Sequence, residues 1–155
     1  MSKVQDRLTE VGLTIPEVPA PVAAYVPAMR TGDLVFTAGQ IPRVAGVLVT
    51  PGRVGAETSR DEARAASRQA ALQAIAAVGS VVDDLDDVQQ VVKVTVFVKS
   101  APGFTDQPFV ADGASELLQT AFADAGRHAR SAVGVAELPL GSCVEVEVIV
   151  EVAHV

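Results

Sequence analysis

The segment from Val144 to Val152, near the end of the chain, constrains the fold more than any other part of the sequence. Valine occupies every second position in this segment. The positions between the valines hold Glu145, Glu147, Ile149 and Glu151. Because side chains alternate between the two faces of a β-strand, the pattern predicts a strand over 143–153 with one apolar and one largely acidic face. A chain with such a strand must bury one face of a sheet and leave the other available.

Length and charge limit the classes of function that the chain can have. Its 155 residues, 49% of them hydrophobic, suffice for a single domain over 1–155 with its own core. The net charge of −7 argues against nucleic-acid binding, because the longest basic run holds only Arg127, His128 and Arg130. No apolar stretch reaches the roughly 18 residues of a membrane span, and the layout of a signal peptide is absent. We therefore expect a cytoplasmic protein without nucleic-acid or membrane partners.

Cysteine and histidine are too rare to suggest a metal centre. The chain has one cysteine and two histidines, which cannot form a zinc site by themselves. A single cysteine cannot form a disulfide within the chain, so we interpret Cys143 as a small residue of the core or of a sheet face.

The first half of the chain indicates a helix, an extended segment and a β-hairpin. Apolar residues at helical spacing predict a helix over 2–11, and residues 1–20 comprise this helix and a proline-containing lead-in. The predicted strands are 22–29 and 34–38, joined at Thr31, Gly32 and Asp33, with a short third strand over 44–49.

The second half indicates two longer helices and three strands. Ser59 and Glu62 form a capping box at the start of a helix that ends at Gly79, with a buried stripe rich in alanine. The other predicted elements are a strand over 88–99, a loop over 102–108, a helix over 112–125, and strands over 130–137 and 143–153. This order predicts an α+β fold, a mixed β-sheet with two main helices on one face.

Arg130 stands at the head of the otherwise apolar strand predicted over 130–137. A guanidinium is costly to leave unpaired among apolar neighbours, so it needs an anion. Glu145 or Glu147 across the sheet can supply one, and so can a bound ligand, and the sequence leaves both possibilities open. The half-polar second face of the sheet also favours packing against copies of the chain, which would place Arg130 near a subunit boundary.

Three segments together give the chain a family resemblance. They are Ala24-Tyr25-Val26 with 35–42 (VFTAGQIP), 91–99 (VVKVTVFVK), and 129–133 (ARSAV) continuing through Leu138-Pro139 to 144–147 (VEVE). In order and spacing, residues 22–152 resemble the YjgF/RidA family of reactive-intermediate deaminases. The first 20 residues and the loop over 102–112 are additional to the shorter members, which indicates a longer and less characterised branch.

The resemblance implies a fold, an assembly and a reaction. The implied fold is chorismate-mutase-like, and the implied assembly is a homotrimer with a central β-barrel and three clefts between subunits. The implied reaction is hydrolysis of enamine or imine intermediates, such as 2-aminoacrylate and 2-iminobutyrate, to 2-oxo acids and ammonia. The resemblance implies that the chain needs no cofactor.

The resemblance also implies roles for three side chains. Arg130 matches the family arginine that holds the substrate carboxylate, a role suited to a planar fork of donors. Glu145 matches the glutamate that positions water or moves a proton, and Tyr25 matches a tyrosine that lines the cleft. Each residue also has a structural interpretation: an ion pair for Arg130, a solvated strand-face position for Glu145, and a strand tyrosine with a wet hydroxyl for Tyr25.

Four further positions complete the predicted substrate-binding site. Gly39 lets backbone groups approach a ligand closely, and Phe104 would cover the cleft from its loop. Ala38 stands where many members have serine, which removes a hydrogen bond of about 0.5–1.5 kcal/mol. Ala132 stands where many members have cysteine and would contribute only main-chain groups.

Two further positions bear on the resemblance. The family's asparagine at the start of the second helix has no clear counterpart, and Asp112 and Gly113 are the nearest positions. His128 either shares the face of Arg130 or simply marks the entrance of the strand.

We therefore predict a homotrimeric imine and enamine hydrolase that binds a small 2-imino or 2-oxo acid. A non-catalytic trimer that senses a small carboxylate metabolite is the alternative. A ribonuclease, an activity sometimes attributed to the family, fits poorly with the charge of −7.

Overall fold

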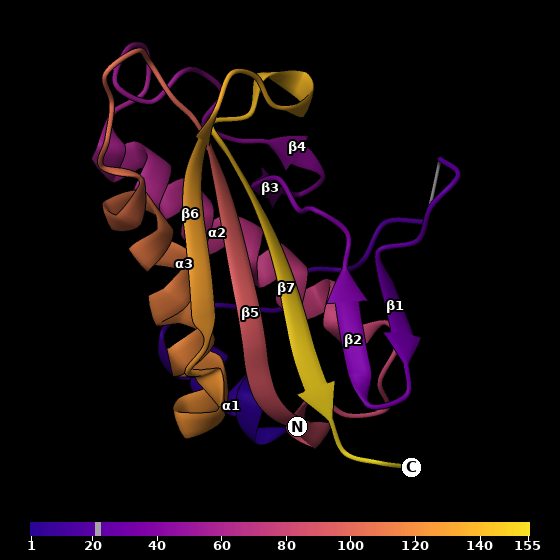
Figure 1. Cartoon of the computed structure of the whole chain (residues 1–155). Coiled ribbons are helices and arrows are strands. Elements are labelled where there is room, and N and C mark those ends of the chain that lie inside the picture. Colours follow the sequence, from indigo (N-terminus) through magenta and orange to yellow (C-terminus); the bar gives the residue numbers. More distant parts are fainter. Residues whose placement is uncertain (21–22) are drawn as a thin grey trace.

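The computed structural model describes residues 1–20 and 23–155, which form a mixed sheet with helices on one face (Figure 1). The strands of this sheet are β1 (Ala28–Thr31), β2 (Leu34–Thr37), β5 (Val88–Lys99), β6 (Ala129–Val135) and β7 (Val144–Val152). Their order is β1-β2-β7-β5-β6, and only β5 and β6 run parallel to each other. The predicted α+β class with a mixed sheet is confirmed.

The helices are α1 (Lys3–Glu10), α2 (Arg60–Gly79) and α3 (Gln107–Phe122), with short 3-10 turns η1 (Leu85–Asp87), η2 (Ala123–Gly126) and η3 (Pro139–Gly141). Helices α2 and α3 lie side by side behind the sheet (Figure 1). Ser59 and Glu62 form the predicted capping box, and α2 ends at Gly79 as expected. Every helix in the described residues is too short or too polar to cross a membrane.

Strand β7 has the two faces that its alternation predicts. All five of its valines are buried against the helices, whereas Glu145, Glu147 and Ile149 are half-buried on the open face of the sheet. Cys143 is fully buried at the start of this strand, as a small core residue. Strand β7 lies between β2 and β5, so it is the element that brings the glutamates to the centre of the open face.

The open face of the sheet carries apolar side chains beside these glutamates. Met29 pairs with Phe36, and Phe36 pairs with Ile149, which gives an apolar row across three strands. Met29 and Phe36 are 59% and 41% exposed in the single chain. The predicted mixture of acidic and apolar side chains on this face is therefore confirmed.

The strand predicted over 22–29 is wrong in its position. Val22 lies outside the described residues, 23–25 form a bend, and β1 begins only at Ala28. Pro27 has no N–H to donate to a neighbouring strand, which explains why regular pairing begins after it. The predicted hairpin with β2 is present, and Gly32 takes the positive φ of 59° that its tight turn requires.

Two other predicted boundaries differ from the structure. The segment 44–49 is not one strand but a small hairpin of β3 (Arg43–Val44) and β4 (Val47–Leu48), because Ala45 and Gly46 both adopt positive φ. Helix α3 starts at Gln107 rather than at 112, since Pro108 is tolerated in a first turn, where its missing N–H has no partner to lose.

Close approach between α2 and α3 depends on a glycine. A Cβ at Gly113 of α3 would overlap the backbone carbonyl oxygen of Arg64 in α2. The hydroxyl of Ser67 bridges the same contact, donating to the carbonyl of Val110 at 2.6 Å and accepting from the N–H of Ala114 at 3.1 Å. The alanine-rich stripe predicted for α2 thus packs against α3 at a position where α3 also carries a small residue, Gly113.

We expect Gly113→Ala to lower the free energy of unfolding by about 1–2 kcal/mol in urea titrations. Helix propensity alone would favour alanine by about 1 kcal/mol, but overpacking against a backbone carbonyl typically costs about 1–3 kcal/mol. Gly79→Ala is the matched control, because a Cβ there meets Leu85 at an ordinary 3.7 Å. Equal stability of the two variants would show that the helices can move apart without cost.

Candidate functional site

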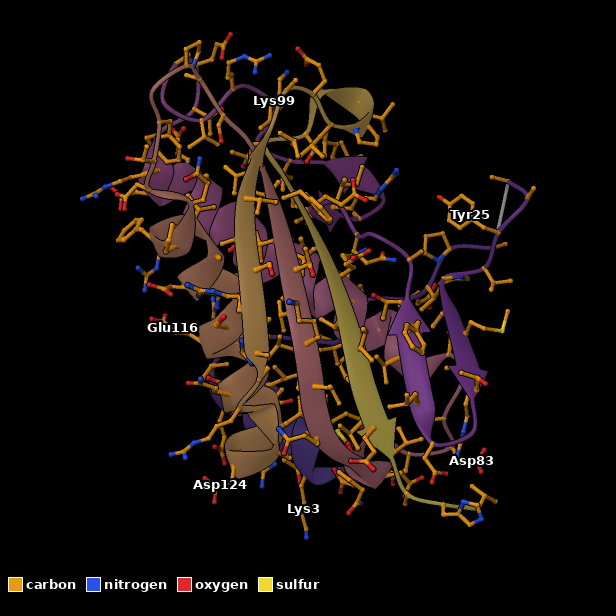
Figure 2. The ribbon with its side chains drawn as sticks, viewed as in Figure 1. Lys3, Tyr25, Asp83, Lys99, Glu116 and Asp124 are labelled. Atoms are coloured by element: carbon orange, nitrogen blue, oxygen red, sulfur yellow. The ribbon has the colours of Figure 1, made fainter. Side chains whose placement is uncertain are left out.

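Three of the residues predicted for the site line one hollow of about 470 Å³. They are Tyr25, Gly39 and Glu145, which come from the loop before β1, the segment after β2, and β7. Figure 2 shows Tyr25 on that loop, apart from the strands, and its side chain is 67% exposed in the single chain. The hollow is therefore open to solvent on the side where Tyr25 stands.

Glu145 is placed by the contact of its strand with the segment after β2. Gln40 exchanges two backbone hydrogen bonds with Val146, at 2.8 and 2.9 Å, so this segment continues alongside β7. The carboxylate of Glu145 lies directly over Gly39, where a Cβ would overlap its Oε1. Gly39 is thus required by the position of Glu145, since its φ is not positive and its backbone conformation does not demand glycine.

Burial raises the pKa of the Glu145 carboxyl above its ordinary value of 4.5, and the nearby negative charge of Glu147 raises it further. Desolvation disfavours the charged form of a carboxylic acid, as does a like charge. A carboxyl group with these properties can exchange protons nearer to neutral pH than a solvated glutamate can.

Arg130 lies outside this hollow, on the helix-covered side of β6. Its Nη1 donates to Oδ1 of Asp112 in α3 at 2.8 Å and to the hydroxyl of Ser115 at 3.2 Å, and its Nη2 donates to the carbonyl of Pro108 at 3.4 Å. Of the two possibilities left open by the sequence, the neighbouring carboxylate is present, but it belongs to Asp112 of α3 and not to Glu145 or Glu147 across the sheet. The side chains of Arg130 and Asp112 are 24% and 43% exposed, so the pair is reached by solvent.

Arg130 and Glu145 point to opposite faces of the sheet. Arg130 pairs with Val94, which is buried under the helices, whereas Glu145 pairs with Phe97 on the open face. Strand β5 also separates the strands that carry them. The two side chains predicted to act together therefore do not meet within one chain.

His128 belongs to the surroundings of Arg130. Its Nδ1 lies 2.6 Å from the carbonyl oxygen of Gly126, and its Nε2 lies 2.8 Å from the hydroxyl of Ser115. A proton on Nδ1 leaves Nε2 free to accept from Ser115, whose oxygen then accepts from Arg130. His128 thus shares the helix side of Arg130 through Ser115 instead of only marking the entrance of the strand.

The remaining predicted residues are dispersed. Ala38 is half-buried, and its carbonyl accepts from Nε2 of Gln40 at 3.2 Å. Ala132 follows Arg130 on the helix side of β6, and Phe104 packs against Gly55 near the end of β5. None of these three residues lines the hollow at Glu145.

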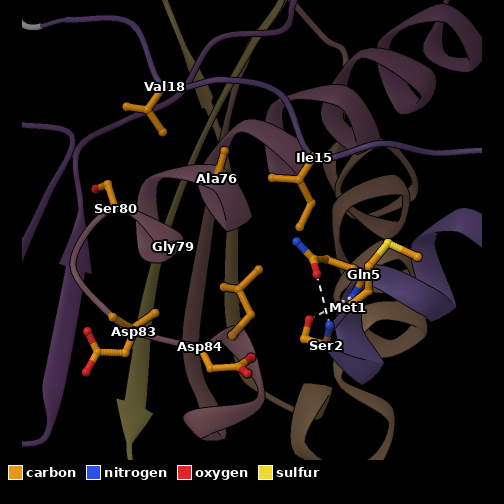
Figure 3. Close-up of a pocket in the computed structure, with 12 residues that line it drawn as sticks. Met1, Ser2, Gln5, Ile15, Val18, Ala76, Gly79, Ser80, Asp83 and Asp84 are labelled. Atoms are coloured by element: carbon orange, nitrogen blue, oxygen red, sulfur yellow. Dashed lines mark hydrogen bonds between the residues drawn. The ribbon is translucent and has the colours of Figure 1, made fainter.

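A larger hollow, of about 670 Å³, lies between α1 and the end of α2 (Figure 3). Its wall includes the capping box of α1 and the side chains of Asp83 and Asp84, but none of the predicted site residues. Within residues 1–20 and 23–155, no three histidine, cysteine or acidic side chains gather as metal ligands. Burial raises the pKa of Cys143 to about 12, so its thiol is not a nucleophile at neutral pH.

Sequence reasoning named Asp112 only as a position near the family's missing asparagine, and it missed Ser115 and Gln73. Asp112 and Ser115 contact Arg130, and Gln73 of α2 lines the hollow at Glu145. Gln73 had a detectable signal, because it is the one polar residue in the otherwise apolar run over 70–78. A polar side chain within a buried helix stripe indicates either a hydrogen-bonded core group or a site.

The family description "YjgF/chorismate mutase-like, putative endoribonuclease" matches residues 5–152 of this chain. The chain therefore belongs to the YjgF/chorismate mutase-like family, in agreement with the resemblance in the sequence.

Individual relatives cover nearly the whole chain. Protein TCP17 of Trypanosoma cruzi is 42% identical over 152 residues, covering 96% of this chain and 94% of its own. A 2-iminobutanoate/2-iminopropanoate deaminase of Dermatophagoides farinae is 34% identical over 140 residues, covering 89% of this chain and 93% of its own. The crystal structure of a protein of unknown function from Agrobacterium tumefaciens has a TM-score of 0.91 at 37% identity, covering 96% and 92%.

We expect Glu145→Gln to raise the thermal unfolding temperature at pH 7. Because the pKa of Glu145 is raised in the folded state, its neutral form stabilises the fold. This stabilisation is fully present below the unfolded pKa of about 4.5. It is lost as the pH rises through the raised pKa of the folded state. Glutamine stays neutral at every pH. The difference in unfolding temperature between Glu145→Gln and the wild type should therefore narrow as the pH falls towards 4.5. Scanning calorimetry at several pH values measures this difference, and Glu151→Gln, at an exposed position of the same strand, is the control. A difference that does not change with pH would contradict the assignment.

Proposed function

We propose that the protein hydrolyses small 2-imino acids and their enamine tautomers to 2-oxo acids and ammonia. The observation that carries the proposal is the Glu145 carboxyl, whose pKa is raised, in a hollow beside Tyr25 and Gly39. Membership of the YjgF family and the similarity to a mite protein named as a 2-iminobutanoate/2-iminopropanoate deaminase support the reaction class.

The proposed reaction requires little more than positioning. Water adds to the imine carbon, the nitrogen takes up a proton, and the carbon–nitrogen bond then breaks to release ammonia and leave a C=O group. Glu145 orients the water and carries the proton between oxygen and nitrogen. Arg130 binds the carboxylate of the substrate through two donors, which fixes the imine carbon relative to the water. No cofactor takes part in these steps.

In the proposal the active site is shared between subunits of a homotrimer. Arg130 and Glu145 lie on opposite faces of one sheet, so a second copy must supply one of them. The apolar row of Met29, Phe36 and Ile149 favours association through the open face, around a central β-barrel. Tyr25, exposed in the single chain, would then lie near the subunit boundary.

The ion pair with Asp112 sets a condition on the role of Arg130. Only Nη1 of Arg130 contacts Asp112, and Oδ2 of Asp112 also lies 4.0 Å from Arg64. We propose that Asp112 orients the guanidinium and leaves its other donors for the carboxylate of the substrate. A partly exposed pair of this kind is weak enough for a ligand to compete with it.

A non-catalytic trimer that binds small carboxylates is the alternative function. Ala38 and Ala132 favour it, because they lack the hydroxyl and the thiol that many family members have at these positions. In that case, 2-oxo acids would raise the unfolding temperature of the protein, while no ammonia would be released from any 2-imino acid.

We expect Arg130→Ala to slow ammonia release from 2-aminoacrylate by about 100-fold or more, because two charge-assisted hydrogen bonds are lost. The rate of ammonia release by Arg130→Lys should lie between those of Arg130→Ala and the wild type. Lysine keeps the positive charge but loses the two parallel donors of the guanidinium. Arg68→Ala, an exposed arginine of α2, is the matched control. Light scattering should give the same assembly size for all variants. Full activity of Arg130→Ala would refute the proposed clamp.

Mixing two inactive variants tests whether the site is shared. Arg130→Ala and Glu145→Gln chains, unfolded together and refolded, should recover about a quarter of wild-type activity. In random trimers, about one cleft in four combines an intact Arg130 with an intact Glu145 from the neighbour. If the mixture stays as inactive as its components, Arg130 and Glu145 do not act from different subunits.

A further inference from the structure

The hollow at Glu145 extends to a buried amide, the side chain of Gln73. Glu145 enters it from the open face, whereas Gln73 belongs to α2, which packs on the opposite face. Both line the same space, so the hollow passes around the segment 39–43 that follows β2. Its volume of about 470 Å³ therefore leaves room for a substrate side chain beside the reacting carbon.

Gln73 is an unusual residue for this position. It is 92% buried, since its relative exposure is 8%. Its Oε1 has no hydrogen-bond partner among the residues that the structure describes, and it is the one buried side-chain atom there in this situation. Buried polar groups without partners are rare in native proteins, and each one calls for an explanation.

Gln69, the neighbouring glutamine of α2, has a structural role that Gln73 lacks. Gln69 precedes Gln73 by one turn on the same side of the helix, and its Nε2 donates to the carbonyl of Arg43 at 2.7 Å. This bond ties β3 to α2. Gln73 has no corresponding bond for its Oε1, although it lies beside the same segment.

The walls between Glu145 and Gln73 are largely apolar. Pro27, Ile41, Pro139 and Leu140 line them, together with residues of the N-terminal lead-in. A largely apolar wall with a few polar groups suits a ligand with an aliphatic stem and a polar end. The charged exception in the wall is Arg43, whose Nη1 already donates to the carbonyl of Gly46 at 3.2 Å.

We infer that Gln73 determines the substrate class of this site, selecting 2-imino and 2-oxo acids whose side chain ends in a neutral hydrogen-bond donor. The inference rests on the proposed function, because it places the reacting carbon at Glu145 and the side chain of the substrate beside Gln73. A primary carboxamide fits best, since it donates to Oε1 of Gln73 and accepts from Nε2. A hydroxyl group donates to Oε1 alone.

Three acids of the same shape test this inference. They are 2-oxosuccinamate, 4-methyl-2-oxopentanoate and oxaloacetate, which end in a carboxamide, an isopropyl group and a carboxylate. Calorimetric titration of the full-length protein should show 2-oxosuccinamate binding about tenfold more tightly than the isopropyl acid, the effect of one buried hydrogen bond. In Gln73→Leu this ratio should fall to about one or invert. Gln119→Leu, on the exposed side of α3, should keep the wild-type ratio.

Two results with the wild type overturn the inference. Equal affinities of the wild type for the carboxamide and the isopropyl acid would mean that water satisfies Gln73. A preference for oxaloacetate would mean that Arg43, and not Gln73, binds the end of the substrate side chain. If Gln73→Leu fails to fold, the ratio in the wild type still decides the question. Thermal unfolding checks the fold, and Gln73→Leu should be the more stable protein, because it removes an unpaired buried amide.

The same titrations separate this inference from the proposed function. If pyruvate binds and 2-iminopropanoate is hydrolysed, but the shape-matched acids bind equally, only the role of Gln73 is refuted. If the carboxamide preference is present and no imine is hydrolysed, the role of Gln73 stands and the proposed reaction fails. If none of the acids binds, both are refuted.

Discussion

The rest of the structure depends on the alternation of side chains along β7. Its valines fill the core under α2 and α3, and the same strand must then present Glu145 and Glu147 on the open face. Because β7 lies between β2 and β5, these carboxylates stand at the centre of the sheet instead of at a solvated edge. The partial burial that raises the pKa of Glu145 follows directly from that position.

The same geometry divides the predicted site in two. Arg130 lies on β6, at the far edge of the sheet from the hollow at Glu145, and it faces the helices, so it contacts Asp112 of α3. One chain thus carries a carboxyl group on one face and a guanidinium on the other. Such an arrangement becomes a single active site only where two copies of the chain meet, and this requirement links the proposed chemistry to the proposed trimer.

The sequence predicted the elements with strong local signals. The alternation of β7, the capping box of α2 and the apolar run of β5 each depend on neighbouring residues, and their boundaries agree with the structure within about one residue. The starts of β1 and α3 were misplaced, because a proline is compatible with more than one local structure. Pro27 ended an irregular segment, whereas Pro108 lay inside the first turn of a helix.

The candidate site was less predictable because it depends on packing. Tyr25, Gly39 and Glu145, which the resemblance assigned to the site, line one hollow. The partner of Arg130 depends on which side of α3 meets β6, and the unpaired amide of Gln73 depends on how α2 packs against 39–43. Neither contact is encoded in local spacing, so neither could be read from the sequence alone.

A crystal structure of the assembled protein soaked with pyruvate tests the central claim most directly. We predict that the pyruvate carboxylate binds Arg130 of one protomer while its carbonyl carbon faces Glu145 of the next. Pyruvate bound away from Arg130, with the guanidinium still held by Asp112 and enclosed within its own chain, would contradict the account.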